Sequence, residues 1–136
     1  MEFSKTLMIS ASGMRAQGQR MRIISENLAN ANSLPQSPDD EPYRRKLPTF
    51  KNALDRSMGI EKVSVDRIEL DRSAFRKRYD PGHPGADAAG YVQLPNVNSL
   101  IEMMDMREAQ RSYEANLNMI TAVRQMMRRT VDILRG

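Results

Sequence analysis

Two proline-free stretches with helical periodicity lie at opposite ends of this 136-residue chain, and they limit what it can fold into. The first runs from about residue 4 to residue 31, where apolar and small residues alternate at spacings of four and three. Such spacing forms a heptad seam, along which one helix packs against another. The seam consists of Leu7, Ala11, Met14, Gly18, Met21, Ser25 and Leu28. Gly18 and Ser25 reduce its apolar area but let a neighbouring helix approach closely.

The second stretch is longer and more apolar. Asn98 or Ser99 can cap its start, and Ser99 with Glu102 has the capping-box spacing. The predicted helix continues to about Leu134. Its broad apolar stripe holds Leu100, Met103, Met104, Tyr113, Leu117, Ile120, Val123, Met127, Val131 and Leu134, with Met106, Met119 and Met126 beside it.

The material between these helices gives weaker signals. Four prolines between residues 34 and 48 predict an irregular, exposed loop. Residues 62–71 alternate polar and apolar side chains, which is the pattern of a half-buried strand, and residues 80–85 are rich in turn-forming types. We therefore predict a mainly α fold, in which the long N- and C-terminal helices pair as a coiled-coil-like hairpin around a small irregular β and loop segment. The expected boundaries are 1–33, 34–97 and 98–136.

This layout predicts a protein that completes its core in an assembly. Pairing the two helices would bury one stripe on each, and the remaining apolar width of the C-terminal helix would face outward as a partner surface. Aromatic residues make up only 5% of the chain and Trp is absent, whereas Met occurs 11 times. Flexible thioether side chains suit contacts with neighbours of different shape.

Composition excludes several classes of function. The chain has no Cys, so it has neither disulfides nor a thiolate metal site. Its formal charge of +4 is dispersed: residues 39–80 carry eleven basic and nine acidic groups, and residues 99–136 carry six and five. Interspersed signs are typical of a solvated surface, so we expect no nucleic-acid binding. No cleavable signal and no apolar run long enough to insert into a membrane is visible.

Neither a catalytic nor a metal site is predicted. His83 is the only histidine, and it lies in a turn between two prolines, so a metal site with Asp80 and Asp87 is not expected. The helical serines have no nearby histidine to act as a base. Glu102 and Asp105 suit the first turn of a helix, where acidic side chains are favourable. We expect no cofactor. Four arginines end the last helix, where they suit the helix dipole or an acidic neighbouring subunit equally well: Arg124, Arg128, Arg129 and Arg135.

Several motifs occur in an order that resembles one known family. The N-terminal stretch Ser10-Ala11-Ser12-Gly13-Met14, continuing to Asn27-Leu28-Ala29-Asn30-Ala31-Asn32, is similar to the signature of flagellar rod and hook axial proteins, and its opening resembles the proximal-rod type. The motifs that follow in the expected order are Pro42-Tyr43-Arg44-Arg45, Tyr79-Asp80-Pro81-Gly82-His83-Pro84, Gly90-Tyr91-Val92, Pro95-Asn96-Val97-Asn98 and Arg111-Ser112-Tyr113-Glu114-Ala115-Asn116. The loop before Pro42 differs, with acidic residues where the family has glycines.

The resemblance implies a structural rod subunit and not an enzyme. Such a subunit passes through the flagellar type III export channel without signal cleavage and then joins the torque-transmitting rod of the basal body. Its implied partners are other rod subunits, neighbouring basal-body proteins and the export apparatus. The expected assembly interface is Leu7, Ala11, Met14, Gly18, Met21, Leu28, Tyr113, Leu117, Ile120, Val123, Met127, Val131 and Leu134. The expected motif residues are Ser10, Gly13, Asn27, Asn30, Asn32, Pro95, Asn96, Asn98, Tyr113 and Asn116.

Two other classes remain open at this stage. A free-standing helical adaptor would use the same seams to form a defined dimer or trimer in solution. A basic nucleic-acid binder would associate with DNA in a strongly salt-dependent way.

Overall fold

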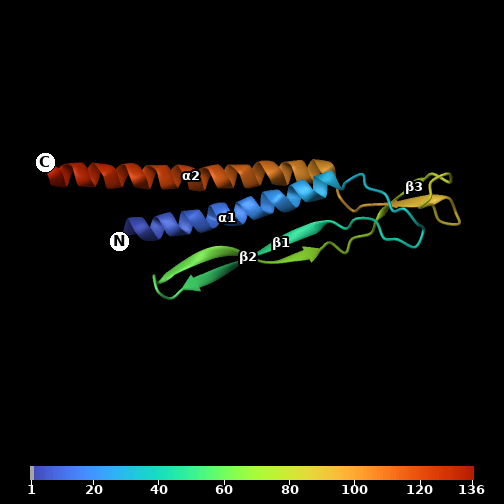
Figure 1. The fold of residues 1–136 in the computed structure, drawn as a ribbon, viewed down its shortest axis with the longest axis horizontal. Helices are drawn as coiled ribbons and strands as arrows, with labels where there is room; N and C mark the ends of the chain where they lie inside the picture. Colours follow the sequence, from blue (N-terminus) through green and yellow to red (C-terminus); the bar gives the residue numbers. More distant parts are fainter. Residues whose placement is uncertain (1) are drawn as a thin grey trace. The chain divides into compact units, whose positions relative to one another are not determined.

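Two long helices and four strands make up the chain (Figure 1). The structure, a computed structural model, describes residues 2–136. The elements follow in the order α1 (Glu2–Ala29), β1 (Lys46–Asp55), β2 (Ile60–Leu70), β3 (Arg76–Tyr79), β4 (Tyr91–Leu94) and α2 (Ser99–Arg135). Both helices were expected from the periodicity. Their bounds lie close to those that the sequence indicated, because the asparagine-rich run after residue 26 ends α1 and Asn98 begins α2.

The strands form two separate two-stranded sheets. β1 and β2 are joined by the short turn 56–59, which only antiparallel neighbours can use. Gly59 lies in this turn with a φ of 63°, a left-handed conformation that glycine adopts without strain. β3 and β4 are also antiparallel, with Arg76 opposite Leu94 and Tyr79 opposite Tyr91.

The chain divides into two compact units, the first built from three segments and the second from two. The first unit comprises residues 1–21, 49–67 and 107–136. In it, α2 runs beside α1 and continues beyond the start of α1 (Figure 1). Its buried residues are mostly small: Ser10, Ser12, Ala16, Ile60, Ala109 and Val123.

The second unit comprises residues 22–48 and 68–106. Its apolar core contains Ile23, Ile24, Ala31, Val92 and Val97. The turn between β3 and β4 requires glycine at position 90. A Cβ there would lie 2.9 Å from the Tyr79 ring, and the residue has a φ of 84°, which side chains disfavour. The Tyr79 and Tyr91 rings meet edge to face at 5.3 Å between centroids.

The prediction of a mainly α fold with an irregular middle is wrong. Helices take up 48% of the chain, but strands take up 21%, in two ordered antiparallel sheets. The sequence predicts a loop at Pro48, yet this residue lies inside β1, and each strand of a two-stranded sheet has a free edge at which a missing N–H is tolerated. All four residues of β3 are exposed, so this strand carries no alternation of polar and apolar side chains that could reveal it.

Candidate functional site

A buried polar cluster lies in the second unit, where the end of α1 and the start of α2 meet the start of β1. Asn27, in the last turns of α1, is only 1% exposed and uses its whole side-chain amide. Its Nδ2 donates to the Lys46 carbonyl at 2.9 Å and to Glu102 Oε2 at 3.2 Å. Its Oδ1 accepts from the Tyr43 hydroxyl at 2.8 Å and from the Lys46 N–H at 3.0 Å. One asparagine thus joins three segments that are distant in the sequence.

Glu102 is the charged centre of this cluster. Its side chain is 1% exposed, and burial of a carboxylate is tolerated only with a partner. Arg45 is that partner, since its Nε donates to Glu102 Oε1. The same guanidinium donates from Nη2 to Asp105 Oδ2 at 3.3 Å and lies 3.6 Å from Asp71 Oδ2. Arg45 therefore holds α2 and the segment after β2 together.

Two further asparagines fix the approach to α2. Asn96 Oδ1 accepts from the Arg45 N–H at 2.7 Å, and its Nδ2 donates to the Asp71 carbonyl at 2.9 Å. Asn98 Oδ1 accepts from the Leu100 and Ile101 N–H groups, so Asn98 is the N-cap. The capping box expected between Ser99 and Glu102 is not formed, because the Glu102 carboxylate accepts hydrogen bonds from Arg45 and Asn27 instead.

The cluster changes the pKa of two groups. Burial of the phenol, followed by repulsion from Glu26 and Glu102, raises the pKa of Tyr43 from 10.0 to about 12. Hydrogen bonds from Ser73, with a smaller contribution from the Arg45 charge, hold the pKa of Asp71 below its usual value. At neutral pH, Tyr43 is therefore a hydrogen-bond donor and Asp71 an anion, as the contacts require.

A second meeting of motif residues lies in the first unit. Gly13 of α1 faces Asn116 of α2, and a Cβ on Gly13 would lie 2.9 Å from Asn116 Nδ2. Asn116 Nδ2 also donates to the Ser112 carbonyl at 2.9 Å. Ser12 Oγ accepts from the Val63 N–H at 3.3 Å, so α1 also touches β2 here. Gly18, in contrast, has no atom within 4 Å of its Cβ position.

The remaining motif residues have structural places. Ser10 is buried, Asn30 donates from Nδ2 to the Glu26 carbonyl at 2.9 Å, and Pro95 is among the most buried side chains. Asn32 is exposed after the end of α1, and Tyr113 is half-buried on α2. The motifs read from the sequence are thus divided between the polar cluster, the contact of Gly13 with Asn116, and positions that touch neither.

The residues predicted to form the assembly interface are mostly not buried within the chain. On α1, Ala11 is exposed and the others are half-buried: Leu7, Met14, Gly18, Met21 and Leu28. The fully buried positions of this helix are different ones, among them Ser12, Ala16, Ile23 and Asn27. The predicted seam is therefore not the face that packs inside the chain.

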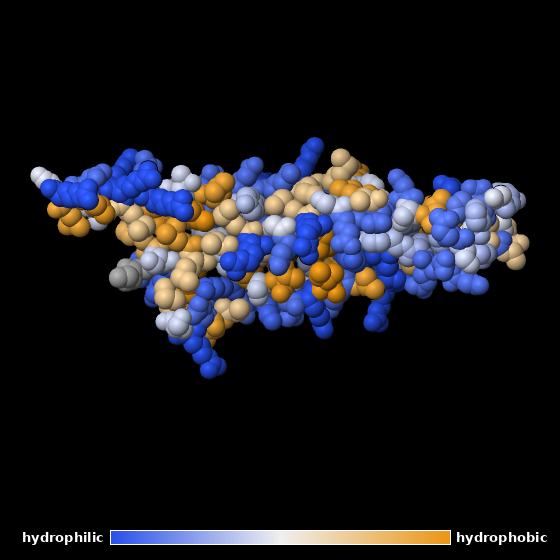
Figure 2. Space-filling model, viewed as in Figure 1, coloured by the Kyte–Doolittle hydropathy of each residue, from blue (hydrophilic) through white to orange (hydrophobic). Residues whose placement is uncertain are grey.

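On α2 the predicted stripe is buried at one position and is exposed toward both ends, since Leu100, Met103 and Met104 near the start of the helix are exposed as well. Val123 is 4% exposed, and Tyr113 and Ile120 are half-buried. Leu117 is 44% exposed, and the exposure rises to 81% at Leu134. Met127 and Val131 are also exposed. Figure 2 shows apolar atoms gathered along the last turns of α2 next to strongly hydrophilic ones.

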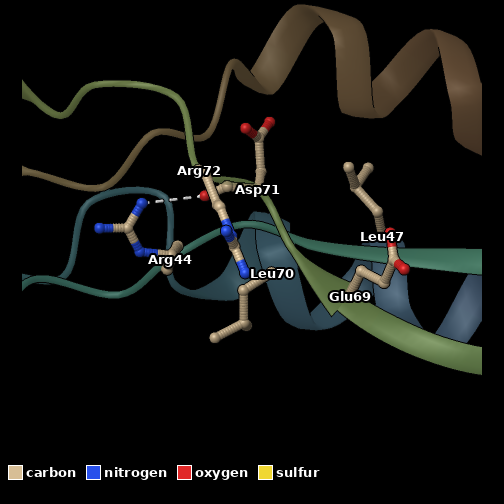
Figure 3. A pocket seen from close by; sticks show the side chains of 6 residues that line it. All are labelled: Arg44, Leu47, Glu69, Leu70, Asp71 and Arg72. Atoms are coloured by element: carbon tan, nitrogen blue, oxygen red, sulfur yellow. Dashed lines mark hydrogen bonds between the residues drawn. The ribbon is translucent and has the colours of Figure 1, made fainter.

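A groove in the second unit is lined by Arg44, Leu47, Glu69, Leu70, Asp71 and Arg72, and its volume is about 970 Å³ (Figure 3). Arg44 reaches across it, donates from Nη1 to the Asp71 carbonyl at 3.0 Å, and stacks on Phe75 with its guanidinium carbon 4.3 Å from the ring centroid. These contacts fasten the chain to itself. Within residues 2–136 no cluster of three metal-ligating side chains occurs, and no helix is long and apolar enough to cross a membrane.

The roles of Glu102 and Arg45 in the cluster are not predicted by the sequence. The sequence predicts Glu102 as a charge of the first helical turn, and Arg45 as a motif residue that either contacts another rod subunit or faces solvent in a loop. One signal was available: Glu102 interrupts the apolar run Leu100, Ile101, Met103 and Met104, and a charge surrounded by apolar positions requires a partner if it is buried. The sequence does not reveal which of 21 basic residues supplies that partner.

Comparison with known proteins places these features in one family. Residues 7–33 match the family model described as Flagella basal body rod protein, and residues 88–133 match the one described as Flagellar basal body rod FlgEFG protein C-terminal. The two matched regions contain α1 from residue 7 onward and most of α2. The hydrogen bond between Asn27 and Glu102 joins these two regions, and so does the contact of Gly13 with Asn116.

Curated relatives extend the match across the chain. The flagellar basal-body rod protein FlgC of Agrobacterium fabrum is 50% identical over 128 residues, which cover 94% of this chain and 92% of the relative. The FlgC proteins of Aquifex aeolicus and Escherichia coli O157:H7 are 40% and 37% identical, over 97% and 92% of this chain. With this identity across nearly all of its length, the chain belongs to the FlgC family of flagellar basal-body rod proteins.

Proposed function

We propose that this structural subunit of the flagellar basal-body rod assembles through α1 and α2 into the axial tube, where it transmits torque toward the hook. The exposed C-terminal part of α2 carries the proposal. Every residue from 124 to 136 is exposed, including Met126, Met127, Val131, Ile133 and Leu134. A surface of this kind needs a cover, and neighbouring subunits would supply it.

The α1 seam supports the same proposal. Its seven positions keep a regular spacing of four and three residues, although the chain buries other positions of the helix. Gly18 leaves open space where a neighbouring helix would come close. One subunit with two different helical surfaces can pack head to tail and repeat along a tube. This arrangement is therefore favoured, and a two-fold dimer is not.

The proposed partners are other rod subunits and adjoining basal-body proteins. The subunit would reach them through the flagellar type III export apparatus without cleavage of a signal peptide. Long helices gripped by many neighbours resist twisting, which is what a torque-transmitting tube requires.

Leu117→Asp tests whether the stripe is an assembly surface. The side chain is 44% exposed, so the subunit should still fold and be exported, while the buried charge should prevent rod assembly. The readouts are export of the subunit, completed basal bodies in electron micrographs, and motility. Asn118→Asp is the matched control, since it adds the same charge at an exposed neighbouring position off the stripe. Normal motility of Leu117→Asp cells would refute the proposal.

A further inference from the structure

The last turns of α2, residues 124–135, stand apart from the rest of the first unit in their exposure. Val123 is the last buried residue of the helix. Beyond it, Val131 is 47% exposed, Ile133 78% and Leu134 81%. Side chains on every side of this terminal segment are therefore exposed.

Its side chains are sorted around the helix axis. At about 100° per residue, the large apolar side chains fall within an arc of about 160°. That arc holds Met126, Met127, Val131, Ile133 and Leu134, and only Thr130 interrupts it. The opposite arc holds Gln125 and all the charged residues. The segment is therefore amphipathic along its full length.

The charges in the polar arc are almost all positive. Four arginines accompany a single acidic residue, Asp132. Arg124, Arg128 and Arg135 lie along one border of the apolar arc, and Arg129 lies near the other. Arg128, Asp132 and Arg135 line a shallow hollow of about 370 Å³ together with Met127 and Val131. An anionic group at this hollow would meet two guanidinium groups and an apolar surface, and the two arginines outnumber the single Asp132 carboxylate.

We propose that residues 124–135 form a peripheral binding site for anionic phospholipid bilayers in the unassembled subunit. A helix with a broad apolar arc and arginines at its borders lies in the plane of the lipid headgroups, with the apolar side chains below and the guanidinium groups at the phosphates. An acidic protein groove is the competing occupant. It would need to enclose an arc wider than the stripe of roughly 100° with which a helix usually packs on one neighbour. This site does not span the bilayer and does not depend on the proposed assembly role.

Vesicle flotation of the purified full-length chain tests the proposal. One set of vesicles contains phosphatidylglycerol and phosphatidylcholine, and the other phosphatidylcholine alone. We expect binding to the anionic set only, weakening as salt rises. Because each arginine near an anionic surface strengthens binding several-fold, Arg128→Glu/Arg129→Glu should lower the partition coefficient at least about tenfold.

Two further variants separate this site from general charge attraction. Arg15→Glu/Arg22→Glu changes net charge equally at exposed positions of α1 and should bind nearly as the parent does. Ile133→Ser/Leu134→Ser keeps every charge but should also lose binding, because insertion needs the apolar arc. Circular dichroism verifies that the variants fold. Equal binding to both vesicle sets, an equal loss in both arginine variants, or full binding by the serine variant would overturn the proposal, as would self-association without vesicle binding.

Discussion

The Asn27 side chain makes four hydrogen bonds, as many as Asn96, but none of those of Asn27 is exposed, and its replacement should reveal this. Asn27→Ala leaves the Lys46 N–H and the Tyr43 hydroxyl without their acceptor and removes a donor from Glu102. We expect a loss of about 2 to 4 kcal/mol in the free energy of unfolding, measured by urea denaturation, because Glu102 is buried and the other two stranded groups are partly buried.

Asn30→Ala is the control for this change. Asn30 has the same side chain three residues later, but its amide donates one hydrogen bond, to the Glu26 carbonyl. The expected loss is below about 1 kcal/mol. Equal losses in the two variants would mean that the cluster does not concentrate stability at Asn27.

The raised pKa of Tyr43 predicts that the folded protein loses stability in alkaline solution. Its folded-state pKa of about 12 lies above the ordinary value of 10.0, so the neutral phenol is favoured by the fold. Its contribution is complete below pH 10 and is lost as the pH rises from 10 through 12. Unfolding measured across this range should decline more steeply in the parent than in Tyr43→Phe. Parallel declines would contradict the role of the phenol.

Identities of single residues in the site were partly predictable. The motifs singled out Asn27, Asn96, Asn98 and Asn116, and all four make side-chain hydrogen bonds. Their partners were not predictable, because Arg45 and Glu102 are 57 positions apart and a long-range ion pair leaves no spacing signal. Such a pair arises from the path of the backbone.

At the scale of elements, two glycines of α1 differ in their surroundings: Gly13 lies close to Asn116, and Gly18 faces open space. Gly18→Ala should raise the free energy of unfolding by up to about 1 kcal/mol, because alanine favours a helix and nothing lies within 4 Å of the new methyl group. Gly13→Ala should lack this gain, because the methyl group would displace the Asn116 amide. Thermal unfolding followed by circular dichroism compares the two. An equal gain would show that Gly13 and Asn116 do not meet closely.

The helices were predictable and three of the strands were not, for one physical reason. A helix with a continuous apolar stripe repeats its signal over many turns, as α2 does over 37 residues. β3 and β4 have only four residues each, and β1 contains a proline near its start. β2 was indicated by its alternating residues. Which face of α1 packs inside the chain was also not foreseen, since small and polar residues such as Ser12 and Asn27 are buried there.

At the scale of the whole molecule, we infer that surfaces left open in the subunit are closed in the rod. Most large apolar residues of α2 are exposed in the chain, and the FlgC relatives are named as basal-body rod proteins. Because the sequence contains no cysteine, a single introduced thiol reports on one position alone. Val131 is 47% exposed and lies on the stripe, and Arg56 is exposed in the turn between β1 and β2.

The most direct test is the rate of maleimide labelling of Val131→Cys in the free subunit and in isolated basal bodies of motile cells. Arg56→Cys serves as the comparison, with labelling of the denatured chain as the reference for full access. We predict that Val131→Cys reacts readily in the free subunit and at least about tenfold more slowly in the basal body. Equal labelling rates at Val131→Cys in the two states would contradict a role of the stripe in assembly, because the stripe would then remain uncovered in the assembled rod.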